Sequence, residues 1–173
     1  MFAQQVLRPM AHTIRASTAV KMLVILLLGL AVAGCAGKKY DVYASGGANA
    51  TPGSAQDFAV NVGDRVFFET DSSDLTARAR TTLDLQSQWL ARYPTYNFVV
   101  EGHADERGTR EYNIALGARR AAAVRAYLIA RGVNSGRMST ISYGKERPVA
   151  VCNDISCWSQ NRRSVTTLKG AGS

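Results

Sequence analysis

The chain has 173 residues, of which 46% are hydrophobic and 20% charged, and its net charge is +8. This length allows one domain with accessory segments. A basic excess would suit nucleic acid, but no basic–aromatic repeat or nucleic-acid motif is present, so we expect an anionic polymer or membrane surface as the electrostatic neighbour.

The first 34 residues have the pattern of a lipoprotein signal peptide. A basic segment precedes the apolar run Met22 to Gly34, which is shorter than the roughly 20 residues of an ordinary membrane span. The end of this run and the next residue, Val32-Ala33-Gly34-Cys35, resemble the bacterial lipobox. We therefore expect cleavage before Cys35 and a membrane anchor of acyl chains on that residue. The alternative is an ordinary secreted protein with a chance cysteine.

Two features after Cys35 bear on location and reach. The two residues after Cys35 are Ala36 and Gly37, and neither is an aspartate. By analogy with enteric lipoproteins, this favours sorting of the protein to the outer membrane. Residues 35–56 are rich in Gly, Ala, Ser and Thr, a composition typical of a flexible tether with a reach of roughly 25 Å. We expect the folded domain to span residues 57–169.

Strands and helices alternate in the expected domain. Hydrophobic patterning predicts strands at 62–68, 96–102, 138–143 and 163–169, and helices at 76–93 and 109–131. Gly117 could divide the second helix into a short turn and a longer helix. The alternation favours an α/β sandwich, in which helices cover one mixed sheet.

One helical face places an arginine within an apolar stripe. With a period of 3.6 residues, that face carries Asn113, Leu116, Arg120, Val124 and Tyr127. An unpaired buried charge is unfavourable, and the nearest upstream carboxylate is Asp105, after the strand at 96–102. Two interpretations are open: a structural salt bridge, or a clamp in which Asp105 takes a ligand's ammonium and Arg120 its carboxylate.

Longer motifs carry a family resemblance. The segment GHADERGTREYNIALGARRA (residues 102–121), with FFETDSSDL upstream and SYGKERP and NRR downstream, resembles the OmpA-like peptidoglycan-binding domain. The resemblance is strongest to the peptidoglycan-associated lipoproteins, and it covers about residues 57–169. It implies a non-enzymatic protein without a cofactor that binds the diaminopimelate stem peptide of peptidoglycan. It further implies a role in the Tol-Pal system, with TolB as a partner, in envelope integrity and cell division.

The resemblance also implies site residues. Asp105 would accept the ligand ammonium and Arg120 its carboxylate, while Asn113 would offer its amide and Leu116 a wall of the site. Asp71, in the loop after the first strand, would touch the peptide.

Three positions depart from the family pattern, which leaves the finer contacts open. Glu69 replaces an aspartate, Thr70 an aromatic residue and Ala104 a threonine.

Metal binding and catalysis are disfavoured. His103 is the only histidine after the leader, whereas a structural zinc needs four ligands. We interpret His103 as a hydrogen-bond donor that positions its loop, and Glu106 and Arg107 as loop charges or partner contacts. Glu101 and Asp105 would lie about 13 Å apart along a strand, and no nucleophile pairs visibly with a base. The alternative function is an OmpA-like domain that anchors a wall-active enzyme or another envelope machine.

Cys152 and Cys157 enclose four residues. In an oxidising periplasm we expect them to form a disulfide that braces the segment before the last strand by about 2 kcal/mol. The alternative is a pair of free thiols.

Overall fold

The computed structural model of the protein describes residues 50–170. The expected signal peptide, Cys35 and most of the expected tether lie outside these residues. In the described part of the chain, no helix combines the length and hydropathy that a membrane crossing requires.

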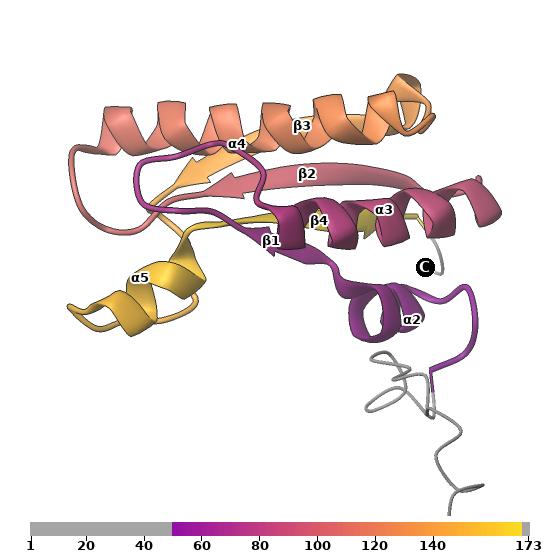
Figure 1. The fold of residues 1–173 in the computed structure, drawn as a ribbon, viewed down its shortest axis with the longest axis horizontal. Coiled ribbons are helices and arrows are strands. Elements are labelled where there is room, and N and C mark those ends of the chain that lie inside the picture. Colours follow the sequence, from indigo (N-terminus) through magenta and orange to yellow (C-terminus); the bar gives the residue numbers. More distant parts are fainter. Residues whose placement is uncertain (1–49, 171–173) are drawn as a thin grey trace, which may run out of the picture. The chain divides into compact units, whose positions relative to one another are not determined.

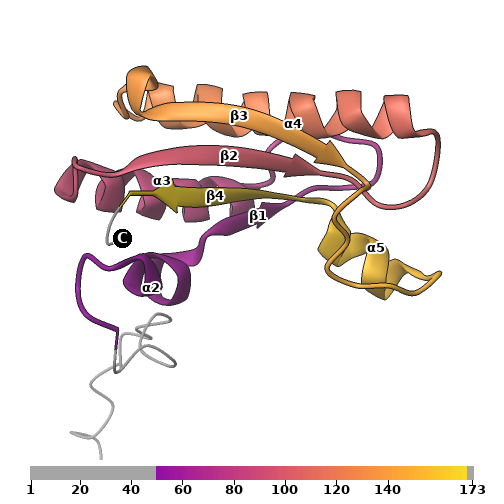
Figure 2. The same cartoon turned by 180° about the vertical axis from the view of Figure 1, so that it is seen from behind.

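A mixed four-stranded sheet forms the centre of the fold (Figures 1 and 2). Its strands, in the spatial order β1-β4-β2-β3, are β1 (Arg65–Phe67), β4 (Arg163–Lys169), β2 (Asn97–His103) and β3 (Met138–Gly144). β2 pairs with β3 in parallel, and the other two pairings are antiparallel. The mixed sheet and its helical cover confirm the expected α/β class.

Two long helices, α3 (Ala77–Arg92) and α4 (Arg110–Ala130), cover the same face of the sheet (Figures 1 and 2). Each begins after a threonine whose side chain accepts a hydrogen bond from a first-turn backbone N–H, the usual N-cap arrangement. The apolar faces of both helices pack on the sheet, and the core includes Leu83, Leu90, Phe98, Val100, Val124 and Leu128.

Gly117 does not interrupt α4, so the expected division of this helix was wrong. The residue serves close packing instead. A Cβ added to Gly102 would lie 1.8 Å from the Gly117 carbonyl oxygen, and a Cβ added to Gly117 would lie 2.4 Å from Ser142 Oγ. The two glycines therefore let α4 lie directly against β2.

The first strand is shorter than expected, because residues 62 and 63 belong to a π-helix, η1 (Phe58–Gly63). Phe58 is 1% exposed, and its ring centroid lies 4.9 Å from that of Trp89. This packing holds η1 against α3, the helix that carries Trp89.

Packed structure begins before the expected domain boundary at residue 57. A short helix, α2 (Ala55–Asp57), precedes η1. Tyr96 Oη donates a hydrogen bond to the Gly53 carbonyl at 2.6 Å, and Gly53 N–H donates to Asp57 at 2.9 Å. Residues 53–56, expected in the tether, therefore contact the core.

Two further short helices were not expected, η2 (Ser135–Arg137) and α5 (Ile155–Asn161). The expected disulfide between Cys152 and Cys157 is present beside α5. Asn161 is 1% exposed, and its amide hydrogen-bonds the backbone of Val149 and Ala150. These contacts hold α5 to the segment before it.

We expect Gly117→Ala to lower the free energy of unfolding by about 1–3 kcal/mol, because the added methyl would force α4 away from β2. At an exposed helical site the same change would stabilise by about 1 kcal/mol. Urea unfolding followed by circular dichroism measures the effect. Ala118→Gly, at the exposed neighbouring position, is the control and should cost about 1 kcal/mol. A Gly117→Ala protein as stable as the parent would contradict the close approach.

Candidate functional site

Four of the five expected ligand contacts line one cavity of about 250 Å³, formed by the loop after β1, the turn after β2 and the start of α4. The lining residues are Thr70, Asp71, Asp105, Arg107, Gly108, Tyr112, Asn113 and Leu116. We call this cavity the Asp105 pocket. Arg120 does not line it.

Asp105 is 7% exposed and is held by two arginines. Arg107 donates two hydrogen bonds to it from one edge of the guanidinium, Nη2 to Oδ2 at 2.7 Å and Nε to Oδ1 at 3.1 Å. Arg162 Nη1 lies 3.4 Å from Oδ2. Burial alone raises the pKa of Asp105, but the hydrogen bonds from these arginines outweigh it and hold the pKa below its ordinary value. The carboxyl group is therefore ionised at neutral pH.

Arg120 is fully buried and lies behind the pocket rather than in its wall. Its guanidinium donates to three backbone carbonyls: Ser72 at 2.8 Å, His103 at 2.8 Å and Glu69 at 3.1 Å. Burial lowers the pKa of Arg120 to about 10, so the group stays charged at neutral pH. Because Arg120 does not line the pocket, the expected ligand clamp of Asp105 and Arg120 is not formed in this conformation. The direct salt bridge is not formed either, because Asp105 pairs with Arg107 and Arg162.

The remaining expected contacts shape the pocket. Asn113 is 2% exposed, and its Nδ2 donates to the carbonyls of Arg107 at 2.6 Å and Thr109 at 3.0 Å. Asp71 has a φ of 53°, a left-handed conformation that aspartate tolerates, and its carboxylate accepts a hydrogen bond from Tyr112 Oη. Leu116 is 5% exposed and forms an apolar part of the pocket wall.

Sequence reasoning missed the part played by Arg107, which it treated as a loop charge. The side chain is 41% exposed, and its guanidinium carbon lies 4.2 Å from the ring centroid of Trp158 in α5. Trp158 in turn donates a hydrogen bond to Glu106. The available signal in the sequence was that Arg107 lies only two positions after Asp105, close enough for the two side chains to pair. The contribution of Trp158, 51 positions further along the chain, depends on the tertiary fold.

His103 does not donate the hydrogen bond expected of it. The side chain is 2% exposed, and neither ring nitrogen has a hydrogen-bond partner within residues 50–170. Burial, together with the positive charges of Arg163 and Arg147, lowers the pKa of His103 to about 4, so the ring is neutral at pH 7. In the same described range, no group of three His, Cys, Asp or Glu side chains is placed to hold a metal.

Known proteins match the segments that build the pocket. A family model described as "OmpA family" matches residues 67–162. The chain belongs to the OmpA family. This confirms the resemblance seen in residues 102–121 and their flanking motifs.

Relatives of this OmpA-family chain share one name. It is 64% identical over 165 residues to "Peptidoglycan-associated lipoprotein" of Mesorhizobium japonicum, covering 92% of this chain and 98% of that protein. It is 66% identical over 157 residues to the protein of the same name from Rhizobium meliloti, covering 88% and 89%. Among solved structures, the crystal structure of the peptidoglycan-associated lipoprotein from Burkholderia pseudomallei matches with a TM-score of 0.62 at 37% identity, covering 64% of this chain and 96% of that one.

We expect Arg120→Ala to destabilise the domain by at least about 3 kcal/mol, because three buried carbonyls would lose their donor. Arg119→Ala is the matched control. Arg119 is the exposed neighbour on the same helix, and its removal should change stability by less than about 0.5 kcal/mol. Thermal and urea unfolding measure both variants. Equal stability of the two would show that Arg120 does not hold the segments together.

Proposed function

We propose that this protein binds peptidoglycan without covalent chemistry and links the outer membrane to the cell wall. The ligand group would be diaminopimelate of an uncrosslinked stem peptide, which presents an ammonium beside a carboxylate. The observation that carries the proposal is the Asp105 pocket: a buried, ionised carboxylate whose cationic partner is partly exposed and therefore exchangeable. The shared name of the relatives supports the choice of ligand.

Binding would proceed as an exchange of ion pairs. Of the two arginines on Asp105, Arg162 has a side chain only 5% exposed and is fixed by its hydrogen bond to the Phe68 carbonyl at 3.0 Å. Arg107 is exposed, so an incoming ammonium would displace Arg107 and keep Arg162. The released guanidinium would remain at the pocket mouth beside Trp158, where it can pair with the ligand carboxylate.

Arg120 was expected to bind that carboxylate directly. While its guanidinium stays bonded to backbone carbonyls, its positive charge would attract the ligand carboxylate without contact. Direct contact requires residues 69–72 to move, because their carbonyls occupy two of its donor nitrogens. Asn113 and Leu116 would form the pocket wall, and Asp71 with Tyr112 its opposite rim.

The remaining parts of the proposal concern the cell envelope. Acyl chains on Cys35 would anchor the protein in the outer membrane, facing the periplasm. Its partners would be TolB and other Tol-Pal proteins, and it would serve envelope integrity and cell division.

We propose no enzymatic activity. A glycosidase needs two carboxylates flanking one bond, whereas Glu101 does not line the Asp105 pocket and its carboxylate lies 3.6 Å from His103 Nε2.

We expect Asp105→Asn to weaken binding of a free diaminopimelate stem peptide at least about tenfold, because the charge that attracts the ammonium is lost. Amidation of the diaminopimelate carboxylate should weaken binding to the parent protein by a similar factor. Isothermal titration calorimetry measures both, with the same change of charge at Glu111, an exposed acid of α4, as the control (Glu111→Gln). Undiminished binding by Asp105→Asn would refute the pocket assignment. Release of muropeptides from peptidoglycan by the pure protein would instead support the wall-enzyme alternative.

We expect Cys35→Ser to convert the membrane-bound protein into a soluble periplasmic form, because no acyl chain could be attached. Fractionation of cells followed by immunoblotting measures the distribution. Continued sedimentation with the outer membrane would argue against lipidation at this residue.

A further inference from the structure

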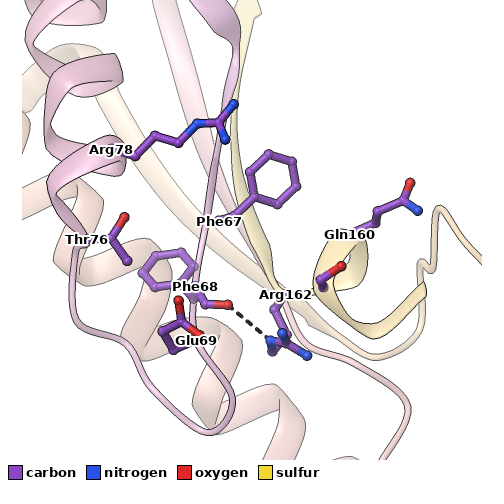
Figure 3. Close-up of a pocket in the computed structure, with 8 residues that line it drawn as sticks. Phe67, Phe68, Glu69, Thr76, Arg78, Gln160 and Arg162 are labelled. Atoms are coloured by element: carbon purple, nitrogen blue, oxygen red, sulfur yellow. Dashed lines mark hydrogen bonds between the residues drawn. The ribbon is translucent and has the colours of Figure 1, made fainter. Parts of the chain in front are cut away.

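A second hollow of about 550 Å³ lies beside β1, and none of its lining residues belongs to the Asp105 pocket. Figure 3 draws these residues and labels Phe67, Phe68, Glu69, Thr76, Arg78, Gln160 and Arg162. A smaller hollow of about 140 Å³ shares Phe67, Thr76 and Arg78 with it and continues past Arg65. Together they form one groove between β1, the start of α3 and the end of α5, which we call the β1 groove.

The floor of the β1 groove is the outer edge of the sheet. β1 is the first strand in the spatial order, and among residues 50–170 it pairs only with β4. Thr166 N–H donates to the Asp64 carbonyl and Phe68 N–H to the Arg162 carbonyl, so the even-numbered residues face β4. In an antiparallel pair the alternate residues point their backbone groups the other way. The N–H and C=O of Phe67 therefore face the groove, and no described residue hydrogen-bonds them.

Positive charge predominates along the groove. Arg65, Arg78 and Arg162 line it, against the single carboxylate of Glu69. Arg65 pairs with Asp64 and Arg162 with Asp105. Arg78 forms no ion pair or side-chain hydrogen bond within residues 50–170, and its guanidinium reaches toward the ring of Phe67 (Figure 3).

The groove also offers an apolar surface. Phe67 is 43% exposed, although phenylalanine is usually buried. It lies next to Arg78 at the point where the two hollows meet. One short stretch of the groove thus combines unpaired backbone groups, an exposed aromatic ring and an unpaired cation.

We propose that the β1 groove binds an extended segment of another protein chain as an added strand. Its backbone pairs with Phe67, an apolar side chain covers the Phe67 ring, and an acidic side chain pairs with Arg78. In such strand addition, main-chain hydrogen bonds give affinity and alternate side chains give specificity. The excess of arginines selects an acidic segment over a basic one. The proposal does not rest on peptidoglycan binding, although the two sites meet at Arg162, which lines the β1 groove and pairs with Asp105.

The first experiment uses fluorescein-labelled peptides and the detergent-solubilised full-length protein. The probe is Val-Glu-Val-Glu-Val-Glu, and fluorescence anisotropy measures its binding. Val-Lys-Val-Lys-Val-Lys tests the charge, and a copy of the acidic probe with alternate backbone nitrogens methylated tests strand pairing. We expect the acidic probe to bind and each of the other two to bind at least about tenfold more weakly.

Protein variants give the second arm. Arg78→Glu should weaken binding of the acidic probe at least about tenfold. Arg80→Glu, the same change on the same helix outside the groove, should change it less than about twofold. Phe67→Pro removes the outward N–H, a substitution that an edge strand tolerates, and should weaken binding at least about tenfold.

Three results would overturn the proposal: no binding of the acidic probe, equal binding of the methylated probe, or equal losses in Arg78→Glu and Arg80→Glu. The methylated probe keeps the test decisive if Phe67→Pro fails to fold. A dimer of the peptide-free protein that Phe67→Pro dissociates would assign the groove to a second copy of this chain instead. Arg78→Glu should bind the free diaminopimelate stem peptide normally, because Arg78 does not line the Asp105 pocket, so failure of either binding proposal can be recognised separately.

Discussion

The buried guanidinium of Arg120 is the interaction on which the rest of this structure depends. Its three donor nitrogens satisfy carbonyls from the loop after β1 and from the end of β2, while its own helix supplies the other side of the Asp105 pocket. A buried charge of this kind is tolerated because its nitrogens are hydrogen-bonded and a carboxylate lies near. The attraction of Asp105 acts to raise the pKa of Arg120, against the effect of burial.

A second constraint is steric. The glycine pair at 102 and 117 sets how closely α4 approaches β2, and the ends of these two elements carry the pocket residues. Gly102 is followed directly by His103, whose carbonyl binds Arg120, and then by Ala104 and Asp105. A shift of the helix would therefore change both the hydrogen bonds of Arg120 and the width of the pocket.

The pocket combines fixed and exchangeable charges. Arg120 and Arg162 are buried and bonded to backbone carbonyls, so they supply a constant positive potential. Arg107 is partly exposed, and a ligand ammonium that replaces it leaves the buried carboxylate of Asp105 paired. The exchange therefore avoids an unpaired buried charge, and the domain can bind a charged group without rearranging its core.

The sequence by itself determined the order of the main strands and helices, the residues of the motif segment and their family. These features are local: apolar periodicity and a nearly continuous motif were enough to place α3, α4 and the strand at 163–169. The tertiary structure decided which donors meet which acceptors. Arg120 meets carbonyls 48 and 51 positions away, and Gly117 packs against β2 instead of breaking its helix. The π-helix before β1 likewise packs on α3 through Phe58 and Trp89, 31 positions apart. Such outcomes depend on distances between segments remote in the chain, which periodicity and spacing along a single chain do not specify.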